Sequence, residues 1–344
     1  MKKYFTLSII LFLFAQTMQA QLSVTERRQM ERLYNAGIEQ FLNRDYLEAM
    51  ASFDQCLAMD HANAKAYLNR GKVNAALGNL EASLADFDLA IQHNADFGEA
   101  YFYKGYFLFG RDTAGVSREM LQMSLTKGFE LAESHYLLGL SNLLEGEEDK
   151  ALMNFNRAIN LKDDYAIAYH DRAGIKRTMG DFNGALYDYK AAVNYWEDFP
   201  VAYNNMGSVK MVLGDYEGAI TDYNRAIQLD AGLYLAYNNR GYASYQLGML
   251  DTAMVDFTKA VELYPGFMEA RMNASSVYAK KGELEIALDL LNEVITIHPG
   301  VGILYLNRGL VKEMSGDIIG ACEDWQMALD LGEEKATEFL EECK

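Results

Sequence analysis

The chain has 344 residues, of which half are apolar and 12% are aromatic, so it can bury a large core. Its 49 acidic residues outnumber its 31 basic ones, which gives a formal net charge of −18 at pH 7. Such a surface repels nucleic acid and anionic lipid, because binding a polyanion depends on clustered Lys and Arg. We therefore expect no nucleic-acid partner, and a protein or peptide partner that is neutral or basic.

The first 20 residues, MKKYFTLSIILFLFAQTMQA, have the layout of a secretory signal peptide. Lys2 and Lys3 precede an apolar run of about a dozen residues, which is short for a membrane span, and the small Ala20 ends the segment. An uncleaved N-terminal anchor is the alternative. Because the short, Lys-Lys-led form resembles bacterial signal peptides, we expect an exported protein with no stable membrane span after signal removal. The predicted location is the periplasm or cell surface of a Gram-negative bacterium.

After a lead-in at residues 21–29, a 34-residue period runs from residue 30 to residue 335 without an insertion. Position 8 of each unit is small and is Gly in seven units, position 20 is always Ala or Ser, and position 24 is always large and apolar. Position 15 is Gly in seven units. The nine units begin at residues 30, 64, 98, 132, 166, 200, 234, 268 and 302.

This pattern predicts a helical hairpin in each unit. Small residues at positions 8 and 20 let two helices approach closely, and the large residue at position 24 belongs to a buried stripe. Gly at position 15 ends one helix, because it takes the left-handed conformation at little cost. A helix of about a dozen residues, a tight turn and a second helix are therefore expected in each unit. One hairpin cannot bury its own apolar face, so the units must stack.

The period and its residues resemble the tetratricopeptide repeat over residues 30–335. Unit 6 carries the pattern most fully, with Tyr203, Gly207, Gly214, Asp215, Tyr216, Ala219, Tyr223 and Ala226. The resemblance implies an all-α fold, a right-handed superhelix of nine helix-turn-helix repeats, closed by a C-terminal capping helix at residues 336–344. In unit 3, the stretch GRDTAG replaces the turn glycine, so a looser turn is expected there.

Arginine occupies position 7 in four units, where this family normally has an apolar side chain, and the same four units carry Asp at position 23. Because positions 7 and 23 lie on facing helices of one hairpin, we predict internal pairs joined by two hydrogen bonds. A row of arginines that binds ligand carboxylates is the alternative. A fifth unit has Asp222 opposite Met206. The predicted pairs are Arg70–Asp86, Arg172–Asp188, Arg240–Asp256 and Arg308–Asp324.

The resemblance also implies that the first helices line a concave groove, into which positions 2, 5, 6, 9, 12 and 13 point. Position 6 is Asn in six of the nine units. An amide both donates and accepts hydrogen bonds, so a ladder of Asn suits the main chain of an extended peptide. The alternative is that Asn caps or solvates a polar helix face. The candidate residues are Asn35, Asn69, Asn204, Asn205, Asn238, Asn239, Asn273 and Asn307.

Aromatic and apolar residues share the predicted groove. We expect those of units 3 and 4 to anchor the ligand's apolar side chains, while the Asn ladder holds its backbone further along. The alternative is that the aromatic side chains pack between repeats. The candidates are Tyr103, Tyr106, Phe109, Tyr136 and Leu140 in units 3 and 4, and Tyr242 and Tyr245 in unit 7.

No catalytic, metal or cofactor motif stands out. The histidines are scattered over different repeat positions, and the adjacent His170 and Asp171 are predicted to point to different faces of their helix. Cys322 and Cys343 could staple the capping helix to the last repeat in an oxidising compartment, and the spacing leaves open whether they are bonded.

We therefore predict a scaffold that is not an enzyme, has no cofactor or metal, and binds a protein or peptide segment in its concave groove. Two alternatives stay open. One is a structural subunit of a cell-envelope assembly that contacts its partners by its convex face and its ends. The other is glycan binding through the groove tyrosines. The oligomeric state is left open.

Overall fold

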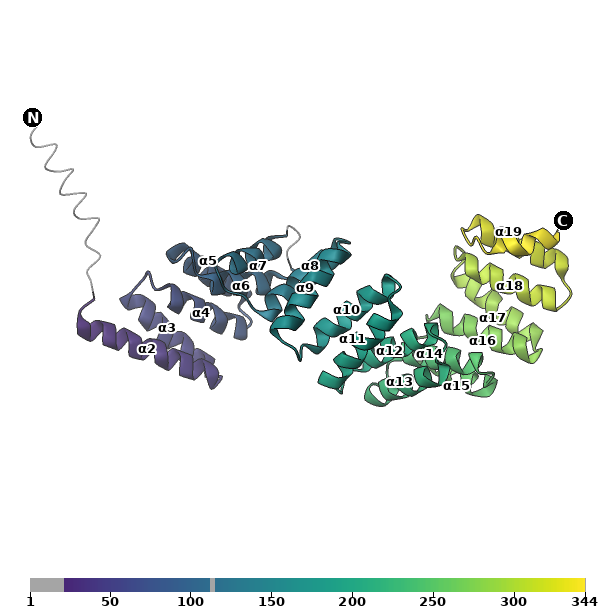
Figure 1. Cartoon of the computed structure of the whole chain (residues 1–344), viewed down its shortest axis with the longest axis horizontal. Coiled ribbons are helices and arrows are strands. Elements are labelled where there is room, and N and C mark those ends of the chain that lie inside the picture. The colour runs from purple at the N-terminus through teal and green to yellow at the C-terminus, as the bar shows by residue number, and fades with distance from the viewer. Residues whose placement is uncertain (1–21, 112–114, 344) are drawn as a thin grey trace, which may run out of the picture. The chain divides into compact units, whose positions relative to one another are not determined.

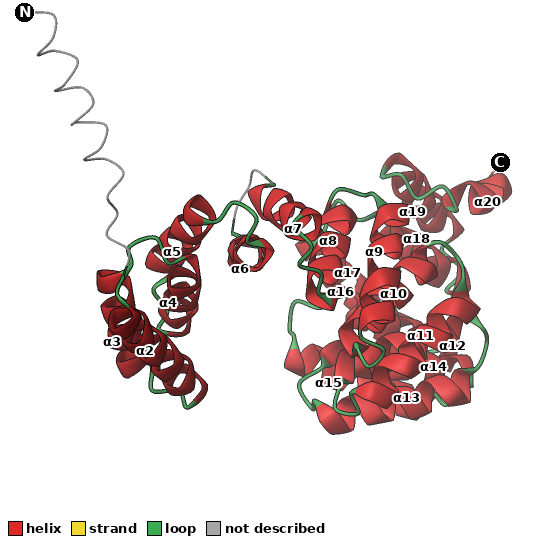
Figure 2. Ribbon diagram, turned by 60° about the vertical axis from the view of Figure 1, so that its left-hand side comes forward, coloured by secondary structure: helices red, strands yellow, loops and turns green. Residues whose placement is uncertain are grey.

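The computed structural model describes residues 22–111 and 115–343, with no side chain described for residue 342. The predicted signal peptide lies outside the described residues, as does the centre of the unit 3 turn, at residues 112–114. The described part is helical throughout and contains no strand, which confirms the all-α prediction (Figure 2). Its residues fall into two compact units, Met1–Leu161 and Lys162–Lys344.

The first compact unit is a series of helical hairpins (Figure 1). Its first helix begins at Val24, ahead of the first repeat, because Ser23 and Glu26 form a capping box that satisfies the free backbone N–H groups. The lead-in is therefore largely helical. The helices are α2 (Val24–Leu42), α3 (Tyr46–Met59), α4 (Ala64–Ala76), α5 (Leu80–His93), α6 (Gly98–Leu108), α7 (Val116–Thr126), α8 (Ala132–Leu144) and α9 (Glu148–Leu161).

The second compact unit continues the same hairpins. Within it the first helices α12, α14, α16 and α18 contact one another in series, and each second helix contacts the next first helix. The helices are α10 (Ala166–Thr178), α11 (Phe182–Tyr195), α12 (Pro200–Val212), α13 (Tyr216–Leu229), α14 (Tyr234–Gln246), α15 (Leu250–Leu263), α16 (Met268–Lys281), α17 (Leu284–Ile297), α18 (Gly302–Met314), α19 (Ile318–Asp330) and α20 (Ala336–Leu340), followed by a 3₁₀ turn at Glu341–Cys343.

In the seven units with glycine at position 8, the hairpin closes where that glycine meets the large side chain at position 24. A Cβ atom added to Gly241 would lie 2.8 Å from the ring of Phe257, which is fully buried. The turn between α12 and α13 uses Gly214 at a φ of +81°, a conformation that L side chains rarely adopt. The small residues therefore set how closely the two helices of a hairpin pack.

The structure brings all four predicted Arg–Asp pairs into contact. Arg240 Nε and Nη2 donate to the two carboxylate oxygens of Asp256, at 2.8 and 2.6 Å, and Asp256 is only 2% exposed. The hydrogen bonds to Asp256 raise the pKa of Arg240. Each of the other pairs has the same two-bonded form: Arg70–Asp86, Arg172–Asp188 and Arg308–Asp324.

Three of these arginines, Arg70, Arg240 and Arg308, reach the preceding repeat with their third nitrogen. Arg240 Nη1 donates to Asn224 Oδ1 at 2.6 Å, and Arg308 Nη1 donates to Asn292 Oδ1 at 2.8 Å. The Arg240 guanidinium also lies 5.5 Å from the centre of the Tyr237 ring. Nε and Nη2 of the guanidinium group bond within the hairpin, and Nη1 bonds to the preceding one. These arginines therefore connect one hairpin to the next.

Asp222 is the buried exception, since Met206 stands where the other four units with Asp at position 23 have arginine. Lys210 forms the ion pair with Asp222 instead, with Nζ 2.6 Å from Oδ2. Burial nevertheless raises the pKa of Asp222 above its ordinary value, against the opposing effect of Lys210. The ionised form of Asp222 therefore disfavours folding.

The chain ends in a cap that is joined to the last repeat. Cys322 and Cys343 form a disulfide that closes a segment of 21 residues, with their Cα atoms 5.9 Å apart. The ring of Phe339 stacks on Trp325 with centroids 5.2 Å apart. The third cysteine, Cys56, is fully buried, and burial raises its pKa to about 11, so the thiol stays protonated.

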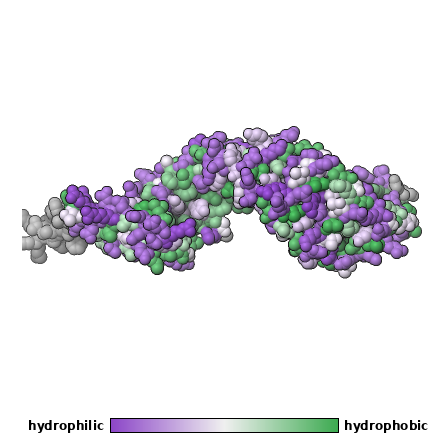
Figure 3. Space-filling model, turned by 90° about the horizontal axis from the view of Figure 1, so that it is seen from below, coloured by the Kyte–Doolittle hydropathy of each residue, from purple (hydrophilic) through white to green (hydrophobic). Residues whose placement is uncertain are grey.

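Apolar and polar side chains are interspersed on the face shown in Figure 3. Among the helices of the described part, none combines the length and the hydrophobicity that crossing a bilayer requires.

We expect the two aspartates at repeat position 23 to respond differently to substitution. Asp256→Ala strands the partly buried Arg240 and should cost about 3 kcal/mol. Asp222→Ala should cost clearly less, because it also removes a buried carboxylate whose ionised form disfavours folding. Urea midpoints at pH 7 measure both, and equal losses would contradict this account.

Since the folded-state pKa of Asp222 is raised, the wild type should gain stability relative to Asp222→Ala as the pH falls towards the ordinary aspartate range.

Reduction of the disulfide should loosen the C-terminal cap. Opening a loop of this length costs about 3 kcal/mol in the chain-entropy account. In a Trp196→Phe background, the fluorescence of Trp325 reports on the last repeat, and its urea midpoint should fall when a reductant is added. A Cys322→Ser/Cys343→Ser variant serves as the control and should not respond to the reductant. An unchanged wild-type midpoint would show that the disulfide does not stabilise the cap.

Candidate functional site

Neighbouring first helices place position 6 of one repeat beside position 5 of the preceding repeat. Asn239 Nδ2 donates to Asn204 Oδ1 at 3.0 Å, and Asn273 Nδ2 donates to Asn238 Oδ1 at 2.9 Å. In the first compact unit, Asn69 Nδ2 donates in the same way to the hydroxyl of Tyr34, at 2.9 Å. The Asn residues predicted to face a ligand therefore hold adjacent repeats together.

Within a repeat, the Asn at position 5 donates to the Asn at position 6. Asn204 Nδ2 lies 3.3 Å from Asn205 Oδ1, and Asn238 Nδ2 lies 3.4 Å from Asn239 Oδ1. Asn204 and Asn238 are 6% and 8% exposed, so the surrounding protein excludes most water from these bonds. Asn205 Nδ2 continues the series to His170 Nε2 at 3.1 Å. We call this series the amide relay: His170, Asn205, Asn204, Asn239, Asn238 and Asn273.

The relay stops at α16 because Met272 occupies position 5 of that repeat and offers no amide to Asn307. Among the described residues, the Asn307 side chain has no hydrogen-bond partner, and Asn273 Oδ1 accepts from none. Both groups are accessible at an open pocket. The C-terminal end of the relay thus presents an amide oxygen and one complete amide to solvent.

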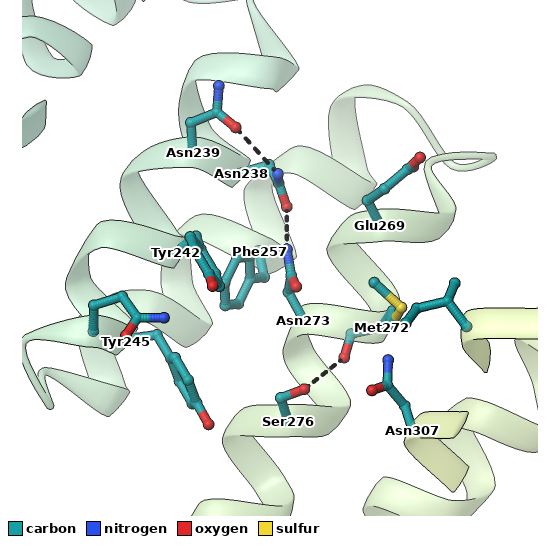
Figure 4. Close-up of a pocket in the computed structure, with 12 residues that line it drawn as sticks. Asn238, Asn239, Tyr242, Tyr245, Phe257, Glu269, Met272, Asn273, Ser276 and Asn307 are labelled. Atoms are coloured by element: carbon teal, nitrogen blue, oxygen red, sulfur yellow. Dashed lines mark hydrogen bonds between the residues drawn. The ribbon is translucent and has the colours of Figure 1, made fainter. Parts of the chain in front are cut away.

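The pocket has a volume of about 530 Å³ and lies on α14, α15, α16 and α18 (Figure 4). Tyr242 and Tyr245 stack with ring centres 6.4 Å apart, and Lys280 Nζ lies 4.5 Å from the centre of the Tyr245 ring. Burial raises the pKa of Tyr245, so its hydroxyl is neutral at pH 7. The lining residues are Asn238, Asn239, Tyr242, Tyr245, Gln246, Phe257, Glu269, Met272, Asn273, Ser276, Ile303 and Asn307.

Half of these lining residues were predicted from the sequence as groove residues: Asn238, Asn239, Tyr242, Tyr245, Asn273 and Asn307. Sequence reasoning missed Gln246, Glu269, Met272, Ser276 and Ile303, although all five occupy groove positions of their repeats. None of the five is Asn or aromatic, and those were the residue types that signalled the groove. Phe257 carried no such signal, since it belongs to the hairpin core.

The predicted anchors of units 3 and 4 are mostly packed between repeats. Tyr103 stacks on Phe87, with ring centres 6.1 Å apart, and lies beneath Lys72 Nζ at 4.1 Å. Phe109, Tyr136 and Leu140 pack against the buried cluster around Leu121. Tyr106 is the exception, at 46% exposed. These contacts agree with the packing alternative, and ligand anchoring by this stretch stays a prediction.

The other predicted Asn residues differ in their surroundings. Asn35 is exposed in the first repeat, where no preceding repeat supplies a partner. Asn69 uses both N–H groups, since it also donates to the backbone oxygen of Lys65 at 2.8 Å.

The prediction that His170 and Asp171 point to different faces was wrong. His170 Nδ1 lies 2.8 Å from Asp171 Oδ1. Adjacent side chains leave a helix about 100° apart, but an imidazole and a carboxylate are long enough to bend together across that angle. No cluster of His, Cys, Asp and Glu that could hold a metal occurs in the part of the chain that the structure describes.

Consecutive helical hairpins whose first helices contact one another in series define a helical-repeat protein. Residues 34–99 and 234–267 match models described as tetratricopeptide repeat, and residues 210–248 match a model described as TPR repeat. These stretches of the chain therefore have the sequence pattern of tetratricopeptide repeats. No curated protein matches it in sequence.

The chain is also similar to solved structures. A tetratricopeptide repeat protein from Parabacteroides merdae matches with a TM-score of 0.51 and 16% identity, over 81% of this chain and 97% of that one. YrrB, described as a TPR protein with an unusual peptide-binding site, matches with a TM-score of 0.48 and 21% identity, over 54% and 95%. Yeast Tom70 matches with a TM-score of 0.47 and 17% identity, over 90% and 77%.

Breaking the relay at a buried member should destabilise the stacked repeats. Asn204→Ala leaves the Asn239 N–H without its acceptor and the Asn205 oxygen without its donor. A loss of about 1–3 kcal/mol is expected, because partly buried polar groups are left unsatisfied. Urea midpoints measure the loss, and Asn35→Ala, at an exposed site, is the control that should change nothing. Equal midpoints for the two variants would show that the relay bonds do not contribute to stability.

Proposed function

We propose that this chain is an exported, non-catalytic scaffold that binds an extended protein or peptide segment in the pocket on α14, α16 and α18. One observation carries the proposal: the unpaired amide of Asn307 and the unpaired oxygen of Asn273 line one open pocket with two tyrosines.

The unpaired groups match the chemistry of a peptide backbone. Each peptide unit has one N–H donor and one C=O acceptor, and the Asn307 side chain can satisfy both. Asn273 Oδ1 offers a second acceptor to a backbone N–H. Tyr242 and Tyr245 add a rigid aromatic surface for apolar side chains, with hydroxyls that can bond at their edge. Main-chain bonds would supply affinity, while the tyrosines would select the side chains that fit.

Charge favours a neutral or basic ligand segment. Among the lining residues, Glu269 is the one charged side chain, and it is exposed. The chain as a whole carries a formal charge of −18, which attracts cationic segments and repels acidic ones.

Two features support an exported location. The first 20 residues have the layout of a signal peptide. The disulfide between Cys322 and Cys343 is of a kind that persists in oxidising compartments and is rare in the cytosol. A Gram-negative periplasm or cell surface accommodates both.

Selection from a displayed library of unstructured peptides against the purified protein tests the proposal. Fluorescence anisotropy of a labelled selected peptide should give a dissociation constant that rises about tenfold for Asn307→Ala, because hydrogen bonds worth about 1.4 kcal/mol are lost. Tyr245→Ala should weaken binding by at least as much. Asn35→Ala is the matched control, since it removes the same residue type at the same repeat position outside the pocket.

Several outcomes would overturn the proposal. Selected peptides that bind Asn307→Ala and Tyr245→Ala as tightly as the wild type would place binding elsewhere. Binding of an oligosaccharide array that depends on Tyr242 and Tyr245, without peptide binding, would establish the glycan alternative. Indifference to all pocket variants, with partners lost on truncation of the terminal repeats, would indicate a structural subunit.

A further inference from the structure

We propose that His170 sets the direction in which the amides of the relay point, and thereby whether the pocket presents the oxygen or the N–H group of Asn273 to its ligand. His170 is then a positioning residue that acts from three repeats away. The consequence for binding rests on the proposed function, whereas the relay and its direction do not.

All amides of the relay donate in one direction along the series, from Asn273 towards His170. Asn273 donates to Asn238, and the bonds then alternate within and between repeats until Asn205 donates to His170. Each amide nitrogen faces the neighbour on the His170 side of the series. Each amide oxygen faces the Asn273 side, which at Asn273 itself is the pocket. A series of this kind has two self-consistent states, all forward or all reversed, because one reversed member would set two donors or two acceptors face to face.

His170 decides between these states at the N-terminal end. Its Nε2 lies 3.1 Å from Asn205 Nδ2, and an amide nitrogen only donates, so Nε2 is the acceptor. Its Nδ1 lies 2.8 Å from Asp171 Oδ1, and a carboxylate only accepts, so Nδ1 carries the proton. The relay as described therefore requires the neutral imidazole.

The groups around the imidazole define its electrostatic setting. Asp171 on α10 is the carboxylate in contact with the ring, with Oδ1 2.8 Å from Nδ1. From α11, the centre of the Tyr189 ring lies 5.5 Å from that of the imidazole. Burial raises the pKa of the Tyr189 hydroxyl, against the opposing effects of Arg177 and Asn205, so the hydroxyl stays neutral. The ring of Phe199 also packs against the imidazole, with ring centres 4.9 Å apart.

The remaining charges nearby are already engaged. Asp188 on α11 is held by Arg172 and Lys176, at 2.7 and 2.8 Å. An imidazole is the side chain that changes charge between pH 5 and 8, so the state of the relay is open to control by pH.

Protonation from solvent turns Nε2 into a donor that faces the donor of Asn205. Rotation of the Asn205 amide by half a turn restores that bond but directs its nitrogen at the nitrogen of Asn204. The same conflict passes along the series until all five amides have turned, and every bond is then re-formed in the opposite sense. At the far end Asn273 accepts from Asn238, and its N–H group faces the pocket. The pocket then favours a ligand acceptor where it had favoured a ligand donor.

The chain itself suggests the decisive variant. Asn204 and Asn238 occupy the same repeat position as His170, so His170→Asn extends the existing pattern. The new amide can accept from Asn205 through its oxygen and donate to Asp171 through its nitrogen, and it does not titrate. His170→Asn should therefore hold the relay in the forward direction at every pH, whereas His170→Leu removes the acceptor and leaves the direction undefined.

Side-chain amide resonances of protein labelled with ¹⁵N-asparagine test the proposal between pH 8 and pH 5. In the wild type, the resonances of the five relay asparagines should titrate with one common midpoint, that of the His170 ring protons. In His170→Asn they should not titrate. Asn69 is the internal control, because its bonds to Tyr34 and Lys65 lie outside the relay.

The outcomes separate this proposal from the proposed function. Titration of Asn205 without Asn273 would show that the change stops at the first bond, and titration in His170→Asn would assign it to another group; either result overturns the proposal. The labelled selected peptide forms the second arm: its affinity should change several-fold between pH 8 and pH 5.5 for the wild type and stay constant for His170→Asn. If no peptide binds, the proposed function fails while the resonances still decide the relay.

Discussion

The contact on which the rest of the structure depends is the close approach of glycine at position 8 to the large side chain at position 24. An added Cβ at Gly241 would lie 2.8 Å from Phe257, and at Gly207 it would lie 2.7 Å from Tyr223. This contact fixes how the two helices of a hairpin cross, and so which side of the first helix faces away from the second. Repetition of one crossing geometry keeps the same positions of successive first helices facing the same way.

Two polar systems use this common geometry on different sides of the first helix. Position 7 faces the second helix, where Arg240 binds Asp256 and reaches back to Asn224. Positions 5 and 6 face the neighbouring first helices, where the side-chain amides bond to one another. Apolar packing alone does not strongly favour one offset between repeats over another. These hydrogen bonds do, because a shift between repeats would leave partly buried polar groups unsatisfied.

The relay changes how an asparagine ladder is understood in this protein. Four of its members, Asn204, Asn205, Asn238 and Asn239, form hydrogen bonds with one another, so their main role is structural. The amide groups that can bond a ligand lie where the series ends, at Asn273 and Asn307. They are left over because Met272 stands where the preceding repeats have Asn. The break in the repeat, rather than the repeat itself, creates the candidate site.

The sequence by itself determined the period, the helical hairpins and the partners of the four arginines. Arg240 and Asp256 belong to one hairpin, and their separation along the chain is set by the local geometry of two helices and one turn, which the spacing encodes.

Only the tertiary structure decided which amides are paired and which are free. The bond from Asn239 to Asn204 joins residues of different repeats, so it depends on the offset between two packed hairpins, and a period of 34 residues does not specify that offset to the tenths of an ångström that a hydrogen bond requires. The contact between His170 and Asp171 was likewise missed, since helical spacing describes where side chains start and not where their polar atoms meet.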